Sequence, residues 1–511
     1  MKKWFYFLIF FAAVSCTQKT KKPNILFCMS DDQTFMHTSF AGAGELKTPA
    51  FDFLANEGVH FNNAYCAVSS CAPSRATILT GKAMWNLQEG GLLFGGLPKE
   101  HATLPAMLAA NGYQTAWTGK GYAPANEQSP KYHQQVLGTS FHEFKGDYHE
   151  SLMDCDYASN FEQFMQQRDD QQPFFFWYGG HEPHRIYERG IGKKSGKNIS
   201  RIQVPDFLPD NDTVRNDIAD YYYEIEWFDS HLARMLKILE QQGELENTMI
   251  IVTADNGMPF PRAKATCYEY GTHMPLVVYW GDKIPKGRTV DDFISFMDFT
   301  PTILEAAGID IPENISGKSF LQQLKSNLNG FIDQQRDQVV TALERHTYCR
   351  KGGLTYPIRA IRKGEMLYIH NFENSRWPAG DTDFYSPHQG YYGDIDAGAT
   401  RSNMLEHQND DHQKKLFEAS FGKRPTEELF NIMQDPENLN NLAEVEEYQA
   451  TKAELKEALF TYLKAHNDPR INGESPWEDM PYYFEGFDKK HLLPIPLRDT
   501  LQESIAHLEG H

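Results

Sequence analysis

The residues most able to do chemistry in this chain follow four short apolar segments. They comprise three carboxylates, one amide and several basic or hydrogen-bonding groups: Asp31, Asp32, Lys120, Tyr122, His181, His184, Arg185, Asp255 and Asn256. Carboxylate and amide oxygens are hard ligands, which suit calcium or magnesium better than zinc. The adjacent carboxylates of Asp31 and Asp32 repel each other, so this pair favours a bound cation. The alternative for either acidic motif is a helix cap or a solvated turn.

A second candidate is the stretch AVSSCAPSRATILTGK, at residues 67–82. Pro73 fits the first turn of a helix, and a Thr-Gly pair ends that helix. Cys71 then lies just before the helix N-terminus, where backbone N–H groups attract anions, and Arg75 adds a fixed positive charge. The lysines that could join them are Lys120 and Lys264. The pattern predicts a site for a tetrahedral oxyanion.

These side chains can meet only if the fold brings distant segments together. The apolar segments at residues 24–29, 113–118, 174–178 and 249–254 have the composition of strands and end in polar or glycine residues. Helical patterns at residues 103–110 and 217–242 lie between them. Alternating buried strands and helices predict an α/β fold with a mostly parallel central sheet flanked by helices. Ligands of such sheets gather beyond the carboxyl ends of the strands, where the candidate residues stand.

The pattern changes after about residue 355. Residues 356–372, YPIRAIRKGEMLYIHNF, are typical of a hairpin of alternating strands, and helical and proline-rich segments follow. We therefore expect a catalytic domain over residues 22–355 and a smaller C-terminal α+β domain with an antiparallel sheet over residues 356–511.

Composition limits the function classes. Apolar residues make up 41% of the 511 residues, which indicates a packed globular protein. The formal charge of −20 argues against a nucleic-acid binder that relies on a basic surface, so we expect no nucleic-acid partner. An anionic substrate stays possible, because a pocket can concentrate positive charge inside an acidic protein.

The first 16 residues, MKKWFYFLIFFAAVSC, have the pattern of an export signal: two lysines, a short apolar run, and a small residue before Cys16. This pattern resembles a bacterial lipoprotein processing site, so we expect lipidation of Cys16 and a lipid-anchored protein, periplasmic or on the cell surface. The alternative is an ordinary cleaved signal peptide with a chance cysteine. The other cysteines form no CxxC pair, which disfavours a disulfide framework or a structural zinc site.

The segment CAPSRATILTGK resembles the signature of the formylglycine-dependent (type I) sulfatases of the alkaline-phosphatase-like superfamily. Other motifs agree in the family's order: the aspartate pair after the first strand, GYQTAWTGK, the Pro-His of HEPHR, VTADNG, and the late ELFNIMQDPENLNNLAE. The resemblance covers most of the mature chain and implies the sulfatase fold.

The resemblance also implies a mechanism. A separate maturation enzyme would oxidise Cys71 to formylglycine, whose hydrated aldehyde supplies the nucleophilic oxygen. A serine would be left as a stable sulfate ester, whereas a geminal diol can expel sulfate by re-forming the aldehyde. One calcium ion would be bound by Asp31, Asp32, Cys71, Asp255 and Asn256. The sulfate oxygens would be held by Arg75, Lys120 and Lys264, and His184 would protonate the leaving group.

One motif departs from the family pattern. Many members have GKxH where this chain has GKGY, so Tyr122 replaces a histidine, and a phenol cannot carry a positive charge near neutral pH. Lys120 has the alternative of a surface lysine, His184 that of a loop residue, and Arg262 could compete with Lys264. The candidate substrate contacts are His181, Tyr122, Arg185, Arg262, Arg345, His346 and Arg359.

The segments PFFFWYGGHEPHR, DNGMPFPRAK and YPIRAIR look most like the heparan N-sulfatase (sulfamidase) branch. We expect a sulfated carbohydrate as substrate, with a sulfamidase as the specific alternative and the linkage left open. Two other function classes stay in view: a phosphohydrolase of the same superfamily, and a glycan-binding lipoprotein without catalysis. The DN motif and Cys71 disfavour the phosphohydrolase, which usually has histidine ligands and a Thr or Ser nucleophile.

Overall fold

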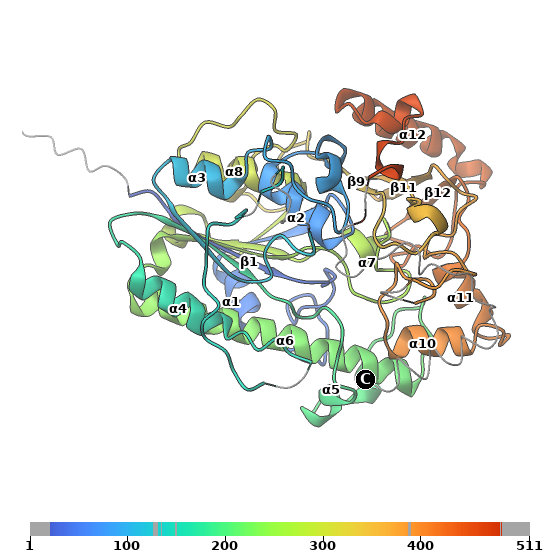
Figure 1. The fold of residues 1–511 in the computed structure, drawn as a ribbon, viewed down its shortest axis with the longest axis horizontal. Helices are drawn as coiled ribbons and strands as arrows, with labels where there is room; N and C mark the ends of the chain where they lie inside the picture. The colour runs from blue at the N-terminus through green and yellow to red at the C-terminus, as the bar shows by residue number, and fades with distance from the viewer. Residues whose placement is uncertain are drawn as a thin grey trace, which may run out of the picture.

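The computed structural model describes residues 21–125, 131–133, 135–148, 151–386, 390–480 and 482. They form one eight-stranded and one four-stranded β-sheet with helices around them (Figure 1). The expected signal segment and its lipidation candidate Cys16 lie outside the described residues. Among the helices that are described, none has the length and apolar character that a membrane crossing requires.

The large sheet has the strand order β4-β3-β5-β1-β6-β7-β2-β8. Its strands are β1 (Asn24–Ser30), β2 (Val59–Tyr65), β3 (Gln114–Gly119), β4 (Thr139–Ser140), β5 (Phe174–Gly179), β6 (Thr248–Ala254), β7 (Leu276–Tyr279) and β8 (Arg288–Ser295). The four strands predicted from the sequence are the consecutive neighbours β3, β5, β1 and β6, all parallel. Since only β7 runs antiparallel to its neighbours, the prediction of a mostly parallel sheet is confirmed.

Helices cover both faces of this sheet, with α2, α3 and α8 on one side and α1, α4 and α6 on the other (Figure 1). Strand β1 shows why its sequence is apolar throughout. Ile25, Phe27 and Met29 pack in the cluster that contains residues of α2, α3 and α8. Leu26 and Cys28 point the other way, into the cluster with residues of α1, α4 and α6. Both faces of the strand are therefore buried, as parallel sheets require.

The predicted helices at residues 103–110 and 217–242 correspond to α3 and α6 of this part, whereas most of its other helices were not predicted. They are α1 (Pro49–Glu57), α2 (Cys71–Thr80), α3 (Leu104–Ala110), α4 (Tyr157–Gln167), α5 (Ile191–Lys194), α6 (Asp212–Gln241), α7 (Glu269–Thr272), α8 (Phe299–Ala306) and α9 (Leu321–Lys325). Helix α6 begins at Asp212, five residues before the predicted start at residue 217. Its N-cap is Asn211, whose side chain accepts a hydrogen bond from the backbone N–H of Val214. The first turn is polar, so hydrophobic periodicity did not reveal it.

The small sheet has the order β12-β11-β10-β9 and is antiparallel throughout. Its strands are β9 (Gln338–Leu343), β10 (Ile358–Lys363), β11 (Met366–Asn371) and β12 (Glu427–Asn431). The predicted hairpin is β10 with β11, which pair antiparallel. Strand β9 precedes the expected boundary at residue 356, so the small sheet begins earlier in the chain than that boundary. Its partner strand follows a 14-residue connection, a pairing that no local pattern reports.

Three more helices accompany the small sheet: α10 (Ala399–Glu406), α11 (Lys414–Phe421) and α12 (Gln449–Ala465). Helix α12 buries Leu455, Leu459 and Leu463, spaced four residues apart on one face. These leucines pack with Ile361 of β10 and Leu429 of β12 in one hydrophobic cluster. The small sheet thus has its own core, and in Figure 1 it lies beside the large sheet, near α7.

Candidate active site

The carboxyl ends of β1 and β6 and the first turn of α2 meet in one buried cluster. Ligand atoms of Asp31, Asp32, Cys71 and Asp255 all lie within 4.8 Å of one another, and all four side chains are buried. Asn256 joins them: its Nδ2 donates to Asp32 Oδ1 at 2.5 Å and to Asp255 Oδ1 at 2.9 Å. The structure therefore brings together every residue expected at the metal site.

Backbone geometry at the end of β1 helps to form this cluster. Asp32 has a φ of 72°, in the left-handed region that residues other than glycine rarely adopt. Its backbone N–H donates to Asp255 Oδ1 at 3.1 Å, which fastens the loop after β1 to the loop after β6. Left-handed backbone at non-glycine residues often marks functional sites, because the surrounding structure must hold it there.

Cys71 is the first residue of α2, one position further into the helix than the sequence predicted. Its Sγ lies 3.4 Å from Asp31 Oδ1 and 3.9 Å from Asn256 Oδ1. Burial raises the pKa of this thiol well above its ordinary value, and Asp31 adds to the shift. A buried thiol among carboxylates is a poor nucleophile, since the thiolate is the reactive form. The six cysteines in the described part of the chain are all free and buried.

Helix α2 is fixed at both ends. Ser70 precedes it in an extended conformation, and the helix stops at Gly81, which has a φ of 65° and donates its N–H to Thr77 O. Pro73 lies in the first turn, as predicted. All ten residues of α2 are buried, so the position of Cys71 follows from packing on every side.

Two lysines contact the carboxylate cluster. Lys120, directly after β3, pairs with Asp31, and Lys264 Nζ lies 2.5 Å from Asp32 Oδ1 and 3.8 Å from Cys71 Sγ. Burial disfavours the charged form of both lysines, but the neighbouring carboxylates outweigh it and raise both pKa values. Both side chains therefore stay cationic beside the thiol at neutral pH.

Arg75 contacts Asp255 and the turn after β3. Its Nε donates to Asp255 Oδ2 at 2.9 Å, and its Nη1 donates to the carbonyl oxygens of Lys120 and Gly121. The side chain is completely buried and is not among the residues that line the cavity described next. Arg75 thus fixes Asp255 and the turn after β3, and its expected role in holding sulfate oxygens stays a prediction.

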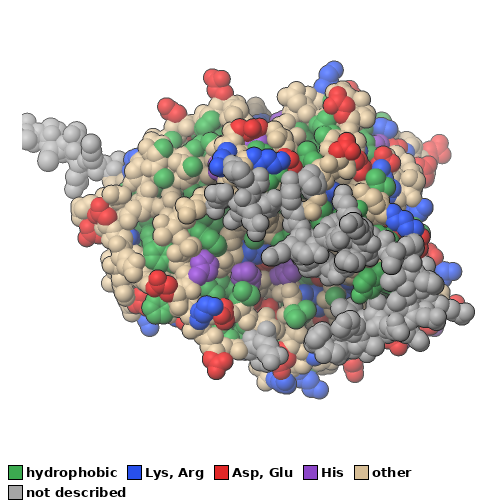
Figure 2. All heavy atoms as spheres, viewed as in Figure 1, with side chains coloured by type: hydrophobic (Ala, Val, Ile, Leu, Met, Phe, Trp, Pro, Cys, Tyr) green, Lys and Arg blue, Asp and Glu red, His purple; other side chains and the backbone are tan. Residues whose placement is uncertain are grey.

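A cavity of about 500 Å³ opens onto the cluster. Its polar lining comes from both acidic and basic residues: Asp31, Cys71, Lys120, Ser151, His181, Glu182, His184, Arg185, Glu224, His346, Thr347 and Asp396. Apolar side chains such as Leu93, Phe94 and Met153 complete the wall. Figure 2 shows histidine side chains gathered near the middle of one face of the molecule, with hydrophobic side chains around them.

The three histidines of the cavity have different surroundings. His184 Nδ1 lies 2.7 Å from the carbonyl oxygen of Arg185, and its Nε2 lies 3.9 Å from Asp32 Oδ2. Nδ1 must therefore carry a proton, which leaves Nε2 as the atom that can exchange one with a bound molecule. Burial lowers the pKa of His181 to about 3 and that of His346 to about 4, so both are neutral near pH 7. His346 Nδ1 also contacts Ser70 Oγ at 2.7 Å.

Several expected substrate contacts are engaged elsewhere. Arg185 lines the cavity, but it forms a bidentate ion pair with Asp217 on α6. Tyr122 is buried in the hydrophobic cluster of the large sheet and is not among the cavity-lining residues. Arg345 donates to the carbonyl oxygen of Met480, in the C-terminal part. These side chains have contacts within the protein, and the expectation that Tyr122 and Arg345 contact the substrate stays a prediction.

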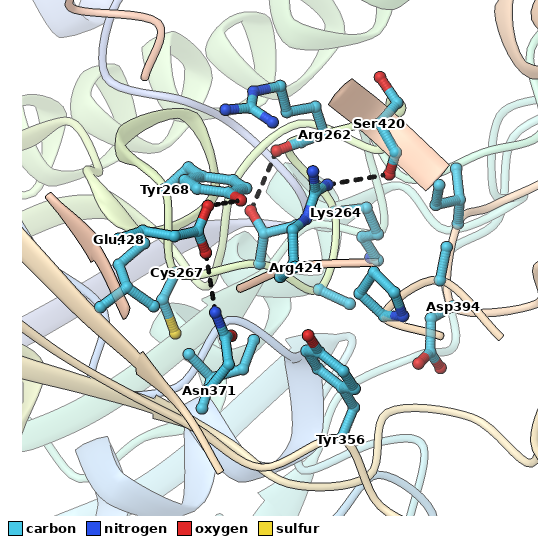
Figure 3. A pocket seen from close by; sticks show the side chains of 17 residues that line it. Arg262, Lys264, Cys267, Tyr268, Tyr356, Asn371, Asp394, Ser420, Arg424 and Glu428 are labelled. Carbon is cyan, nitrogen blue, oxygen red and sulfur yellow. Dashed lines mark hydrogen bonds between the residues drawn. The ribbon is translucent and has the colours of Figure 1, made fainter. Parts of the chain in front are cut away.

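Arg359 and Arg262 also lie away from the cluster. Arg359 belongs to strand β10 of the small sheet, and its side chain is completely buried, where it pairs with Glu344 and Asp468. Arg262 donates to the carbonyl oxygens of Ala419 and Asn438 and stacks on a tyrosine ring. It lines a separate cavity of only about 20 Å³, shown in Figure 3, where Glu428 accepts hydrogen bonds from Tyr268 and Asn371. Lys264 borders the same small cavity, but its Nζ contacts Asp32 and lies 3.8 Å from Cys71 Sγ, which agrees with the preference for Lys264 over Arg262.

Asp396 and Glu224 are two of the cavity residues that the sequence reasoning missed. Asp396 Oδ2 lies 3.4 Å from Lys264 Nζ, and ligand atoms of Asp396, Asp32 and His184 lie within 4.8 Å of one another. Glu224 comes from the middle of α6. Neither follows a strand, and Glu224 falls within a regular helical pattern, so the sequence carried no local signal for either.

Comparisons with known proteins agree with this geometry. A family model described as Sulfatase matches residues 23–309. An ulvan-active sulfatase of Formosa agariphila is 29% identical over 493 residues, which cover 88% of this chain and 76% of that protein. Human N-sulphoglucosamine sulphohydrolase is 26% identical over 408 residues, covering 72% of this chain and 77% of the human protein.

The fold is also similar to solved structures. A protein solved in complex with its substrate D-glucosamine-2-N,6-O-disulfate superposes with a TM-score of 0.66 at 21% sequence identity. The alignment covers 89% of this chain and 100% of that protein. The α/β architecture, with its large mostly parallel sheet and separate small antiparallel sheet, is therefore shared over nearly the whole described chain.

Proposed function

Since the chain belongs to the sulfatase family and is thus a sulfuric ester hydrolase, we propose that it releases sulfate from a sulfated carbohydrate, using calcium and a formylglycine made from Cys71. One observation carries the proposal. The residue at the signature cysteine lies at the inner end of the cavity, beside three carboxylates, an asparagine and two lysines. A sulfate group that enters this cavity meets the nucleophile position and fixed positive charge together.

The donor set fits calcium. Asp31, Asp32, Asp255 and Asn256 offer hard oxygen atoms from two adjacent strand ends, with residue 71 beside them. Burial raises the pKa of Asp32 to about 7 and also raises that of Asp255. The positive charges of the lysines therefore do not offset the cost of burying these carboxylates. When bound, calcium would lower the pKa of the attacking hydroxyl group and neutralise charge on the sulfate.

Charge balance supports the same assignment. The ionisable groups of the cluster are four carboxylates and three cations: Asp31, Asp32, Asp255, Asp396, Arg75, Lys120 and Lys264. When all are ionised, one negative charge remains, which would repel an anionic substrate. A divalent cation converts this into one positive charge, which matches the single negative charge of a sulfate monoester.

As formylglycine, residue 71 would supply a hydrated aldehyde that attacks sulfur with one hydroxyl oxygen and expels sulfate through the other. Lys120 and Lys264 would hold sulfate oxygens, and they are preorganised because both are buried and already charged. His184, in its cationic form, would donate the Nε2 proton to the sugar atom that leaves. His181, which is neutral, would serve as a hydrogen-bond partner rather than a charge.

The names of the relatives support a glycan as substrate. One relative is an ulvan-active sulfatase and another is the human N-sulphoglucosamine sulphohydrolase. We propose a sulfated saccharide and keep the sulfamidase reaction as the specific alternative. Maturation would require a formylglycine-generating enzyme, and the N-terminal pattern supports export with a lipid anchor at Cys16.

The decisive experiment combines the modification with sulfate release. Intact-peptide mass spectrometry on chain made in a host with a maturation enzyme should find an aldehyde in place of the Cys71 thiol. The same protein should release sulfate from members of a panel of sulfated mono- and oligosaccharides that includes N-sulfated glucosamine. Cys71→Ala should abolish release while the thermal midpoint stays close to that of the wild type.

Three results would overturn the proposal. Full sulfate release by Cys71→Ala would remove the mechanism. Far better turnover of phosphate esters, restored by zinc and not by calcium, would favour the phosphohydrolase. If the chain made in a host with a maturation enzyme keeps its Cys71 thiol and still binds sulfated glycans, a binding protein without catalysis would be favoured.

A further inference from the structure

The cavity has a second polar part, which the proposed mechanism does not use. Glu182 and Glu224 line it together with Ser151, and we call these two glutamates the acidic end. The charged groups that act most on Glu224 are Glu182, Arg185 and Asp220, whereas those that act most on Cys71 are Asp31, Lys120, Lys264 and Asp255. The Glu182 side chain bonds Met153 and Tyr157, and among the described residues neither glutamate side chain pairs with a side chain of the metal cluster, although the Asp31 backbone N–H donates to Glu182 O at 3.1 Å. The acidic end therefore adjoins the sulfate end as a distinct part of one cavity.

The two glutamates differ in how they are satisfied. Glu182 Oε1 accepts a hydrogen bond from the backbone N–H of Met153 at 3.0 Å, and its Oε2 accepts one from the Tyr157 hydroxyl group at 2.8 Å. Glu224 is also completely buried, but neither of its oxygens has a hydrogen-bond partner among the described residues. The Ser151 hydroxyl group lies beside it and slightly lowers its pKa, without reaching hydrogen-bond geometry.

Within the described part of the chain, no cation forms an ion pair with Glu224. Arg185 is the positive group that lowers the pKa of Glu224, but both of its terminal nitrogens donate hydrogen bonds to Asp217. Burial, and the nearby Glu182, raise the pKa of Glu224 well above its ordinary value. An unpartnered polar group in a protein interior is costly, and such groups are rare in folded proteins. Here the group faces a cavity, where a bound molecule can supply the missing partner.

We propose that Glu224 is a specificity-determining residue, which hydrogen-bonds a hydroxyl group of the saccharide and keeps a second sulfate or carboxylate out of this part of the cavity. The inference rests on the proposed function, because it assumes that the sulfate of the same sugar lies at Cys71. A sugar hydroxyl can donate to Glu224 or accept from it, so either protonation state of the carboxyl group is served. A second anionic group would meet no unpaired cation here, since Arg185 is engaged by Asp217, and it would be repelled by either carboxyl group whenever that group is ionised.

The test compares Glu224→Gln and Glu224→Ala with the wild type. The substrates are the saccharide from which the wild type releases sulfate fastest, the same saccharide with one further sulfate, and 4-nitrophenyl sulfate, which has no sugar. Glu226→Gln is the matched control, since it removes a carboxylate from the same helix that pairs with Lys197 and does not line this cavity.

We expect the wild type to prefer the less sulfated saccharide. Glu224→Ala should raise KM for that saccharide about tenfold, the size expected for one hydrogen bond, with kcat changed less than KM. Glu224→Gln should reduce the preference against the additional sulfate by about tenfold. Turnover of 4-nitrophenyl sulfate should stay within twofold in both variants, and Glu226→Gln should match the wild type on all three substrates.

The inference is overturned if both Glu224 variants keep the wild-type KM and the wild-type preference. It is also overturned if turnover of 4-nitrophenyl sulfate falls as much as that of the saccharide, because this would indicate a general structural role. A wild-type enzyme that releases sulfate from no compound would instead refute the proposed function, and this inference with it. Thermal midpoints of all variants show whether each is folded.

Discussion

At the scale of single residues, two cations that stand two positions apart show how much direction matters. Lys264 contacts Asp32 and lies 3.8 Å from Cys71 Sγ. Arg262 has a φ of 67° and points to the carbonyl oxygens of Ala419 and Asn438. The same loop thus places one positive charge at the reacting centre and uses the other to bind α11 and the loop after β12.

Replacing each cation by alanine should separate these roles. Lys264→Ala should lower kcat/KM for sulfate release by about 10²–10³-fold, because it removes a preorganised charge from the sulfate. Arg262→Ala should leave kcat/KM within about twofold and lower the thermal midpoint, since it leaves buried carbonyl groups unpaired. Steady-state kinetics and thermal unfolding of both variants check this. Equal kinetic losses in the two variants would contradict the assignment.

The residues found from the sequence are those that a motif places at a strand end. Asp31, Asp255 and Lys120 each follow a strand whose end is predicted by the end of an apolar segment. Parallel pairing of these strands brings their ends together. Arg359 could not be assigned in this way. It lies within a strand, and whether such an arginine faces a sugar or an internal carboxylate depends on Asp468, more than 100 residues away.

At the scale of elements, helix α6 connects most of the parts around the site. Its Asp217 holds Arg185, its Asp220 accepts backbone N–H groups of Gly190 and Gly192, and its Glu224 reaches the cavity. Figure 1 shows α6 running along the whole lower face of the large sheet. Periodicity predicted this helix well, but not what its polar side chains do, because each partner lies in a distant loop.

Asp229, also on α6, makes a testable contribution to stability. Its carboxylate accepts hydrogen bonds from the backbone N–H groups of Ala50 and Phe51 at the start of α1, at 3.0 and 2.9 Å. Burial raises its pKa to about 7. The folded state therefore binds this proton more tightly than the unfolded state, so the contribution of Asp229 is greatest below about pH 4 and is lost as the pH rises to about 7.

Asp229→Asn removes this titration. The stability advantage of the wild type over the variant should therefore be larger at pH 5 than at pH 8, by up to roughly 3 kcal/mol. Denaturant unfolding at the two pH values measures the difference. Glu240→Gln, on the exposed side of the same helix, should show the same difference from the wild type at both pH values. Parallel behaviour of Asp229→Asn and the wild type would refute the assignment.

The large sheet could be predicted from the sequence better than the small sheet. Strand β1 is buried on both faces, so its sequence is apolar at every position from Ile25 to Met29 and could be recognised alone. The boundary of the small sheet could not be placed, because β9 has the composition of any buried strand. Only its antiparallel pairing with β10, across an intervening loop, assigns it to that sheet.

At the scale of the whole molecule, the metal cluster links segments that are far apart in the sequence. Asp31 and Asp255 come from strands separated by more than 200 residues, and Cys71 comes from a helix on one face of the sheet. A cation bound there would stabilise the folded chain only, because the unfolded chain does not hold these ligands together.

Removing calcium should therefore lower both activity and thermal stability. EGTA should reduce the thermal midpoint, and added calcium should restore it, with about 2.7 kcal/mol regained at a concentration one hundred times Kd. Asp255→Asn should make the midpoint much less sensitive to EGTA. Thermal scans at several calcium concentrations test this, and a calcium-loaded wild type whose midpoint does not change with EGTA would contradict it.

The burial of α2 has a final consequence, which concerns the order of events. The Cys71 side chain is only 2% exposed, and the helix around it is covered on every side. An enzyme that oxidises this residue must handle the segment as an extended peptide, so under the proposed mechanism it has to act before the chain folds. Folding and maturation then compete in time, and a molecule that folds first is permanently inactive. The active fraction of a preparation would report how fast the chain was modified, and no later addition of the maturation enzyme to folded protein could raise it.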